Sequence, residues 1–257
     1  MKKLQKLSAV IITHNAEEVL AECLESVSWA DEIILLDFKS SDKTLDIAVR
    51  YGVMVYQSNT WPGYGKQRQI AQSYANYEMI LMIDSDERVT TELQQSINLI
   101  LQQPPAKIVY SISRCNVFLG QAMRHGGWYP DRVIRLYPSC YAYNNHLVHE
   151  SLDVSAIPIR SLHGDLLHLT SRDFCTFQLK QCSYAKAWAK QRYQKGKHYS
   201  ITKIIYRSFW SFIRTLLVRG SFLDGTRGWL LAIVVCQYTF NKYVALWDLN
   251  CTSRNRN

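Results

Sequence analysis

The sequence has little of what marks exported or membrane-spanning proteins. Its longest apolar stretch, Trp229 to Phe240, contains Gln237 and Thr239 and is far shorter than the roughly 20 residues that a spanning helix needs. The apolar run at residues 9–12 ends at once in a polar Thr-His-Asn segment, so it is too short for a signal peptide. We therefore expect neither a transmembrane segment nor export.

The cysteines also lack any pattern that would indicate a disulfide framework or a zinc site. There are seven, an odd number, widely scattered and without a C-x-x-C pair, so we expect reduced thiols in a cytosolic protein. With 257 residues that are 47% hydrophobic, the chain can bury a sizeable core in one large domain or one domain with an appendage.

Acidic residues are nearly missing from the last third of the chain. Residues 180–257 hold 14 Lys and Arg against two Asp and Glu, whereas residues 1–179 hold 16 against 19. This asymmetry indicates an acidic or neutral body joined to a basic tail that meets an anionic partner, either nucleic acid or a membrane surface.

Short apolar runs alternate with segments of helical periodicity from residue 7 onward. The predicted strands are Leu7–Ile12, Glu32–Asp37, Val53–Gln57 and Glu78–Ile83, and the predicted helices are Ala16–Val27, Lys43–Tyr51, Gly65–Asn76 and Glu92–Gln102. Such alternation is typical of an α/β fold with a Rossmann-like, mostly parallel sheet flanked by helices. Ligands in these folds bind beyond the carboxyl ends of the strands.

The rest of the chain divides into a mixed segment and a helical one. Residues 107–169 predict smaller strands and loops, and residues 171–257 predict a basic helical C-terminal region. The predicted domains are an α/β domain at 1–170, with one half at about 7–104 and the other at about 105–170, and the helical region at 171–257. A hinge is expected near Gly220–Gly228, where glycines separate two helices.

An acidic cluster directly follows the fourth predicted strand. Asp84-Ser85-Asp86-Glu87 places carboxylates at the exposed end of a buried strand, and carboxylate oxygens suit Mg²⁺ or Mn²⁺, which complete their shell with nucleotide phosphates. A solvated loop leading into a helix is the alternative. Asp37, at the end of the second strand, is placed to accept hydrogen bonds from a base or ribose.

These motifs together resemble glycosyltransferase family 2. The likeness rests on Val10-Ile11-Ile12-Thr13-His14-Asn15, on Glu32–Asp37 with Ser40-Ser41-Asp42 and Thr44, and on Asp84-Ser85-Asp86-Glu87, and it covers about residues 7–150. It implies the GT-A fold, a UDP-sugar donor and a divalent metal, Mn²⁺ or Mg²⁺. It also implies that residues 1–170 form a GT-A catalytic domain, with a nucleotide-sugar half at about 7–104 and an acceptor half at about 105–170. Phe38-Lys39 departs from the common pattern, where small or acidic residues and glycine are usual.

The resemblance assigns roles to individual residues of the donor site. Thr13 and Asn15 would line the nucleotide pocket, Asp37 would bind the base, and Asp84 and Asp86 would hold the ribose and the metal-diphosphate group. Lys66 and Arg68, at the start of a predicted helix, are placed to meet the diphosphate, although Lys66 equally fits an ordinary surface helix.

Inverting transfer needs a carboxylate that takes the proton of the acceptor hydroxyl. The main candidate is Glu150, in a His-Glu pair that resembles the signature of a family 2 subgroup, and Asp131 is the second candidate. His168 lies in an apolar segment, where a buried core histidine or a third metal ligand are both possible readings.

A further stretch suggests the acceptor. Trp128, Arg132 and Arg135 suit stacking on a sugar and pairing with phosphate, or plain packing and rim charges. This stretch resembles lipopolysaccharide inner-core β-1,4-glucosyltransferases, as does Arg219–Gly225 with the helix after it. The likeness implies transfer of glucose from UDP-glucose to a heptose of a lipid-linked core oligosaccharide.

The basic tail predicts where the protein acts. On a helical wheel, Lys203, Arg207 and Arg214 share one arc, and the apolar side chains of the segment face the other way. We expect peripheral membrane contact through residues 200–246, at the cytoplasmic face of the inner membrane, rather than nucleic-acid binding. The alternatives are a polyprenyl-phosphate acceptor, a noncatalytic sugar-nucleotide-binding protein and a nucleic-acid-binding protein.

Overall fold

A computed structural model of the chain describes residues 3–144, 151–152, 154, 157–170 and 173–254. The chain forms two compact units. The first, the sheet unit, contains Met1–Arg114 and Asp131–His168, and the second, the helical unit, contains Cys115–Pro130 and Leu169–Asn257. Residues 115–130 thus pack with the C-terminal helices, whereas the sequence-based boundary near residue 170 assigned them to the catalytic domain.

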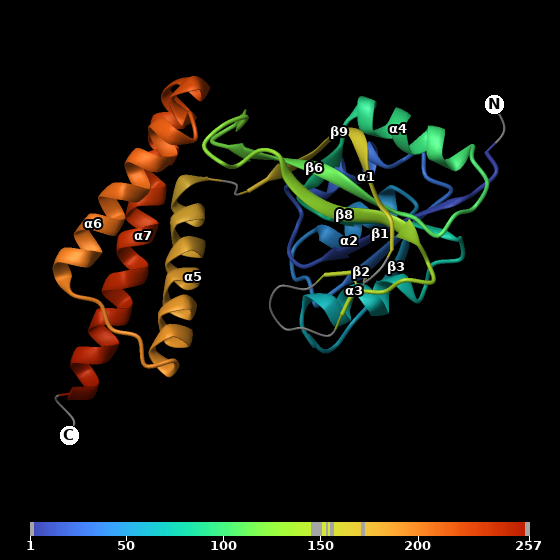
Figure 1. Cartoon of the computed structure of the whole chain (residues 1–257). Coiled ribbons are helices and arrows are strands. Elements are labelled where there is room, and N and C mark those ends of the chain that lie inside the picture. The colour runs from blue at the N-terminus through green and yellow to red at the C-terminus, as the bar shows by residue number, and fades with distance from the viewer. Residues whose placement is uncertain (1–2, 145–150, 153, 155–156, 171–172, 255–257) are drawn as a thin grey trace. The chain divides into compact units, whose positions relative to one another are not determined.

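The sheet unit is built on one mixed sheet with the strand order β3-β2-β1-β4-β8-β6-β9-β5 (Figure 1). Its strands are β1 (Leu7–Thr13), β2 (Glu32–Asp37), β3 (Met54–Gln57), β4 (Met79–Asp84), β5 (Glu87–Val89), β6 (Val109–Phe118), β8 (Asp131–Pro138) and β9 (Ile159–Leu169). Strands β3, β2, β1 and β4 run parallel. Strand β8 pairs antiparallel with β4 and β6, and β5 pairs antiparallel with β9.

Both faces of the parallel strands are covered, because successive side chains of a strand point to opposite faces. On one face, Leu7, Ala9 and Ile11 pack with apolar residues of α1 (Leu20–Ser26), α2 (Thr44–Arg50) and α4 (Thr91–Leu101). On the other face, Val10 and Ile12 pack with α3 (Tyr64–Gln72) and with residues of β4 and β8. This two-sided burial explains why the strands read as continuous apolar runs.

The predicted strands and helices of this half are confirmed, with differences at their ends. Strand β2 has the predicted bounds, whereas α1 begins at Leu20, four residues after the predicted start at Ala16. The reason lies in the neighbouring loop. The amides of Ala16 and Glu17 donate to the side chains of Thr44 (2.7 Å) and Asp42 (3.1 Å), which satisfies them without a helical turn.

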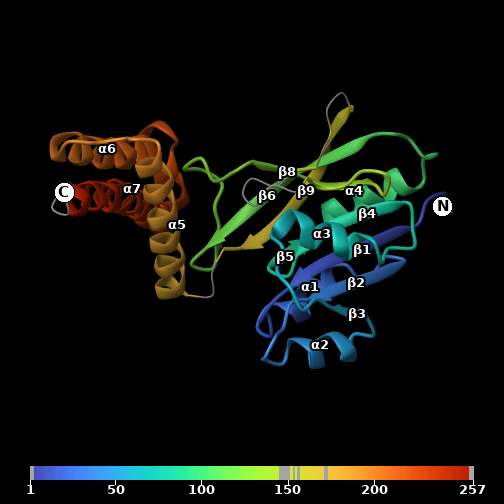
Figure 2. The ribbon, with the colours of Figure 1, turned by 90° about the horizontal axis from the view of Figure 1, so that it is seen from below.

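The helical unit consists of a short hairpin and three helices. Strand β7 (Gln121–Ala122) pairs with the end of β6. Helix α7 (Gly225–Arg254) packs against both α5 (Phe174–Gln194) and α6 (Ile201–Ile213), as Figure 2 shows. A π-helical turn, η1 (Arg214–Val218), and a 3-10 turn, η2 (Ser221–Asp224), connect α6 to α7. The hydrophobic core of this unit contains Phe118, Met123, Phe177, Leu231 and Val234.

Helix α7 is longer than the apolar run that the sequence suggested. In the part of the chain that the structure describes, one helical segment, Ser221–Thr252, is long and apolar enough by length and composition to cross a membrane. The polar Gln237 and Thr239 interrupt the run in the sequence but do not interrupt the helix. The expectation that no segment reaches spanning length is therefore corrected, and the expected peripheral contact stays a prediction.

Candidate functional site

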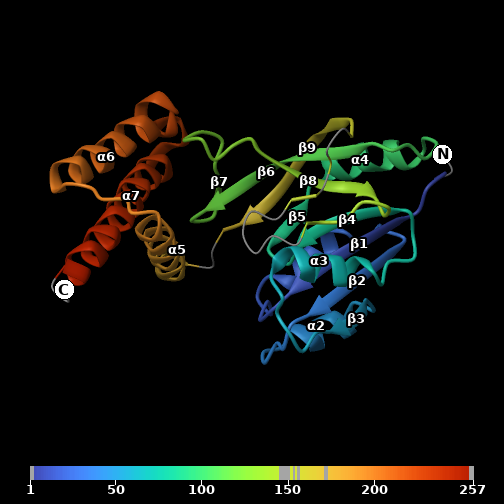
Figure 3. The same ribbon diagram turned by 60° about the horizontal axis from the view of Figure 1, so that its bottom comes forward.

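Three of the predicted site residues meet at one edge of the sheet. The strand register sets Thr13 beside Asp37 and Ile12 beside Asp84, so that β2, β1 and β4 end side by side (Figure 3). The carboxyl ends of parallel strands form the usual ligand edge of an α/β sheet. The residues singled out from the sequence therefore lie where a ligand site is expected.

Two loops at this edge hold each other in place. The carboxylate of Asp37, which is buried, accepts from the backbone amide of Ser40 at 3.0 Å. Asn15 has a left-handed backbone conformation, its amide donates to the Ser40 hydroxyl at 2.8 Å, and its side-chain oxygen accepts from the amide of Ser41 at 2.9 Å. The hydroxyl of Thr13 is buried and has no hydrogen-bond partner among the described residues, which leaves a polar atom free for a ligand.

Aromatic side chains that the sequence analysis did not assign lie along the same loops. The ring centroid of Phe38 is 5.5 Å from that of His14 and 5.2 Å from that of Trp61, and Trp61 meets Tyr64 edge-on at 4.9 Å. Trp61 and Tyr64 are exposed. Phe38 is the position where the sequence departs from the common family pattern, and its contacts show that a ring cluster has formed there.

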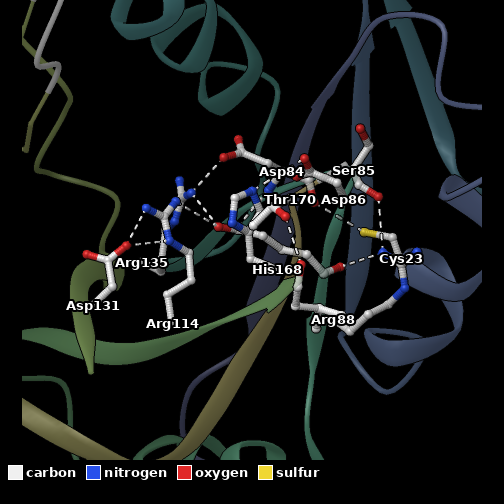
Figure 4. Close-up of polar contacts among 12 residues, drawn as sticks. Cys23, Asp84, Ser85, Asp86, Arg88, Arg114, Asp131, Arg135, His168 and Thr170 are labelled. Atoms are coloured by element: carbon white, nitrogen blue, oxygen red, sulfur yellow. Dashed lines mark hydrogen bonds and ion pairs between the residues drawn. The ribbon is translucent and has the colours of Figure 1, made fainter. Parts of the chain in front are cut away.

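The first aspartate of the acidic cluster is bound by two arginines, one of which, Arg135, is labelled beside it in Figure 4. Asp84 accepts from Arg68 at 2.7 and 3.0 Å and from Arg135 at 2.7 Å. Both arginines are almost completely buried. Burial alone would raise the pKa of Asp84, but Arg135 and Arg68 outweigh it and hold that pKa well below its usual value. Asp84 is therefore a carboxylate that stays ionised and holds the two arginine side chains.

Glu87 extends this contact set towards β6 and β8. It is fully buried, accepts from Arg135 at 2.7 Å and from the amide of Asp84 at 2.9 Å, and lies 3.6 Å from Arg114. Arg114 in turn donates to Asp131 at 2.9 Å. Burial raises the pKa of Glu87 despite the opposing effect of Arg135. The donor-side carboxylate Asp84 is thus linked through ion pairs to the candidate base Asp131.

The sequence analysis assigned no role to Glu87 or Arg114, and it did not predict the buried surroundings of Arg135. Arg135 was expected to meet a phosphate of the acceptor, but it lies buried between Asp84 and Glu87, whereas Arg132 on the same strand is exposed. Arg132 and Arg135 point to opposite faces of β8, and the sequence pattern alone did not show which of the two faces is buried. The roles predicted for Arg132 and Arg135 stay predictions.

Asp86 and His168 form the pair that best fits a metal. Strand β5 pairs with β9 so that Glu87 faces His168, which brings the His168 ring to 3.5 Å from the Asp86 carboxylate (Figure 4). Two ligands about 2.1 Å from one ion and at right angles lie roughly 3 Å apart, so the separation suits a shared cation. Among the described residues no cluster of three His, Cys, Asp or Glu offers a fuller set.

The remaining predicted residues lie elsewhere. Lys66 is exposed on the first turn of α3 and donates to Gln69 at 3.0 Å. Trp128 belongs to the helical unit, where its ring packs against Phe118 and Phe177. Glu150 lies outside the described residues. The structure therefore brings together Thr13, Asn15 and Asp37, and separately Arg68, Asp84, Arg135 and Asp131, the last joined through Glu87 and Arg114.

Comparison with known proteins identifies the family. The family described as Glycosyl transferase family 2 matches residues 8–155, which is more than half of the chain and includes the carboxyl ends of β1, β2 and β4. The chain belongs to glycosyltransferase family 2. The resemblance stated from the sequence motifs is thereby confirmed, and the protein is an enzyme of the glycosyltransferase class.

Relatives agree over most of the chain. An uncharacterized glycosyltransferase of Rickettsia typhi is 28% identical over 98% of this chain and 90% of its own length. The lipopolysaccharide core biosynthesis glycosyltransferase LpsC of Rhizobium meliloti is 26% identical over 91% of this chain and 89% of its own length. Both alignments extend well beyond the family 2 segment and into the basic C-terminal region.

A solved structure shares the fold. The mannosyltransferase PcManGT of Pyrobaculum calidifontis, solved with GDP-mannose and Mn²⁺, matches with a TM-score of 0.54 at 10% identity and covers 95% of this chain and 88% of its own. This match supports the fold alone. The mixed sheet flanked by helices is the GT-A fold that the motifs predicted.

Proposed function

We propose that this glycosyltransferase is an inverting enzyme that transfers a hexose, glucose from UDP-glucose, to a heptose of the lipopolysaccharide inner core. The observation that carries the donor half is the meeting of Thr13, Asp37 and Asp84 at adjoining strand ends, with Asp86 two residues on. The acceptor half rests on the relative named for lipopolysaccharide core biosynthesis and on the Trp128–Tyr137 stretch.

The residues around Asp86 fit a divalent ion, Mn²⁺ or Mg²⁺. Asp86 and His168 would hold it, together with diphosphate oxygens of the donor, since such ions take oxygen-rich shells that include substrate phosphates. When bound, the ion supplies positive charge against the leaving nucleoside diphosphate. Asp84 is bound to two arginines, so we assign to it the ordering of the site and contact with the ribose.

The acceptor hydroxyl must lose a proton as the new glycosidic bond forms. Glu150 is our first candidate for this base and Asp131 the second. Asp131 already accepts hydrogen bonds from Arg114, at 2.9 Å from its Nε, so its carboxylate is engaged in an ion pair. This pairing favours Glu150 and leaves Asp131 the role of a positioning residue.

We also infer that the enzyme works as a peripheral protein on the cytoplasmic face of the inner membrane. Two observations support this location: residues 180–257 hold 14 Lys and Arg against two Asp and Glu, and the seven cysteines form no disulfide. A bilayer surface with anionic lipids attracts such a basic segment. The alternative acceptor, a polyprenyl phosphate, would place the enzyme at the same surface.

The test is nucleoside diphosphate release by the purified protein with Mn²⁺, a panel of nucleotide sugars and heptose-bearing core oligosaccharide. We expect acceptor-dependent UDP release with UDP-glucose. Asp86→Ala should abolish it, and Glu150→Gln should lower kcat by about 10²–10⁴-fold. Asp46→Ala and Glu92→Gln, exposed carboxylates on α2 and α4, are the matched controls and should act like the wild type.

Other outcomes would distinguish the alternatives. A larger loss of kcat in Asp131→Asn than in Glu150→Gln would assign the base to Asp131. Donor binding without turnover on any acceptor would instead indicate a sugar-nucleotide-binding protein. Turnover with a polyprenyl phosphate and none with the heptose acceptor would overturn the proposed acceptor.

A further inference from the structure

Helix α6 turns its largest apolar side chains away from its own unit. Its buried positions include Ile204 and Ser208, and Ser208 bonds back to the carbonyl of Ile204 at 2.8 Å. Ile205, Phe209 and Trp210 are exposed instead. A helix of a water-soluble bundle normally buries its apolar face, so this arrangement is inverted and indicates that the outer face meets something apolar.

The connection between α6 and α7 also exposes apolar side chains, and here they lie close together in the chain. Four apolar side chains in η1 and η2 are exposed: Leu217, Val218, Phe222 and Leu223. We call these four residues the apolar turn. Exposed apolar patches of this kind mark sites of interaction with a partner or a membrane.

The apolar turn is held by its packing and is not a loose loop. The Ser221 hydroxyl donates to the carbonyl of Gly228 at 2.5 Å. Gly228 lies so close beneath η2 that a Cβ atom there would be 1.6 Å from the carbonyl oxygen of Ser221. Because the turn is fixed against the start of α7, its apolar side chains project outward as a preformed surface.

Positive charge surrounds this surface. Arg214, Arg219 and Arg227 lie next to the apolar turn in the chain and are exposed, within a region that holds 14 Lys and Arg against two Asp and Glu. Along α7 the exposed Trp229, Phe240 and Trp247 follow at spacings of 11 and 7 residues, which places them on one side of the helix. Basic and aromatic residues around an apolar centre are complementary to an anionic lipid interface.

We propose that the apolar turn inserts into the headgroup and upper acyl region of an anionic phospholipid bilayer, with the flanking arginines on the lipid phosphates. This inference rests on the proposed membrane location and specifies its chemistry. The proposal places the apolar turn, and not the length of α7, in the bilayer, because α7 packs within its own unit: Arg207 donates to the Tyr243 hydroxyl at 2.8 Å, and Trp188 packs edge-on against Tyr243.

The test is co-sedimentation of the full-length protein with vesicles of phosphatidylglycerol and phosphatidylethanolamine, compared with phosphatidylcholine vesicles. The variant is Val218→Ser/Leu223→Ser, whose side chains are 69% and 61% exposed. The matched control is Val49→Ser/Leu99→Ser in the sheet unit, with side chains 70% and 61% exposed. We expect the wild type and the control to bind anionic vesicles, and the turn variant to bind at least roughly tenfold more weakly.

Four results would overturn the proposal. The turn variant could bind anionic vesicles as well as the wild type does, or the wild type could bind phosphatidylcholine vesicles equally well. A single-stranded oligonucleotide could displace the wild type and the turn variant from vesicles to the same extent. Finally, the protein could resist extraction from membranes by carbonate, which would indicate that α7 spans the bilayer. UDP release on core oligosaccharide freed of its acyl chains is measured in parallel. The turn variant should keep this activity, so that loss of vesicle binding is distinguished from failure of the proposed reaction.

Discussion

Arg135 stands between two carboxylates, and its removal would leave both without their main partner. Asp84 and Glu87 each accept from it at 2.7 Å, and Glu87 is fully buried. Losing one partner of a buried ion pair costs about 3–5 kcal/mol. We therefore expect Arg135→Met to lower the free energy of unfolding by about that amount in urea denaturation followed by circular dichroism.

Arg132→Met is the matched control, because Arg132 lies on the same strand and is exposed. It should change the free energy of unfolding by less than about 0.5 kcal/mol. Equal effects of the two substitutions would show that the carboxylates do not depend on Arg135.

The cysteines offer a second test at the residue scale. Cys23 and Cys115 are buried, whereas Cys140, Cys175 and Cys182 are exposed. Burial raises the pKa of the Cys23 thiol well above its usual value, and the thiolate is the reactive form. Native alkylation with iodoacetamide, read by mass spectrometry, should modify the three exposed cysteines and spare Cys23. Modification of Cys23 at a comparable rate would contradict its described burial.

The sequence predicted the place of single residues in the fold where strand ends fix that place, and did not predict it where one of two strand faces had to be chosen. Asp37 and Asp84 are the last residues of apolar strands, so they lie at the carboxyl edge of the sheet. Arg135 and Arg132 lie three positions apart on one strand, and only the pairing of β8 with β4 and β6 determines which is buried. That pairing joins segments far apart in the chain, so local pattern did not contain it.

At the scale of elements, the contact of β9 with the start of α4 depends on one glycine. Gly164 has a φ of +92°, and a Cβ atom there would be 2.2 Å from the backbone nitrogen of Leu93. Gly52 also has a positive φ, +66°, but faces open space. Gly164→Ala should cost about 3–5 kcal/mol from backbone strain plus crowding, and Gly52→Ala about 1–2 kcal/mol from strain alone.

Thermal or urea unfolding of the two glycine variants measures this difference. If Gly164→Ala were no worse than Gly52→Ala, β9 and α4 would have to move apart without cost. That result would be inconsistent with the hydrogen bonds of Thr90 to Asp165 that join the two elements.

The elements themselves were largely predictable, because period and length distinguish them. The parallel strands are continuous apolar runs, and α4 begins after Thr90, whose hydroxyl caps the amide of Leu93. Helix α7 extends well beyond the apolar stretch from Trp229 to Phe240 that the sequence showed, because polar residues on either side lower the apolar signal although they continue the helix to Arg254. Asn250, in the last turns of α7, donates to the carbonyl of Lys197 at 3.2 Å and contacts the His198 ring at 2.8 Å, which ties this end to the segment between α5 and α6.

At the scale of the whole molecule, the helical unit is assembled from two separate stretches of chain. Phe118 and Met123 come from residues 115–130, whereas Phe177, Leu231 and Val234 come from α5 and α7. A chain ending at His168 would therefore keep Phe118 and Met123 but lose the side chains that cover them. We expect this truncated chain to bind the dye ANS and to aggregate in size-exclusion chromatography.

Phe118→Ser/Met123→Ser in the truncated chain provides the control. It should lower both ANS binding and aggregation, because it removes the uncovered apolar side chains. A truncated chain that stays monomeric without these substitutions would show that residues 115–130 do not need the helices. The sequence did not predict this dependence. The charge distribution divides the chain into a neutral part and a basic part, and it does not show that residues 115–130 pack with the basic C-terminal helices.

The interrupted order of the helical unit also matters during synthesis. Phe118 and Met123 leave the ribosome well before α5 and α7, and translation proceeds at about 5–20 residues per second. Their partners in α7, more than a hundred residues later, therefore arrive several seconds after them. During that interval the side chains of Phe118 and Met123 lack the α7 residues that cover them in the folded unit, and slower translation lengthens the time for which this apolar surface is exposed.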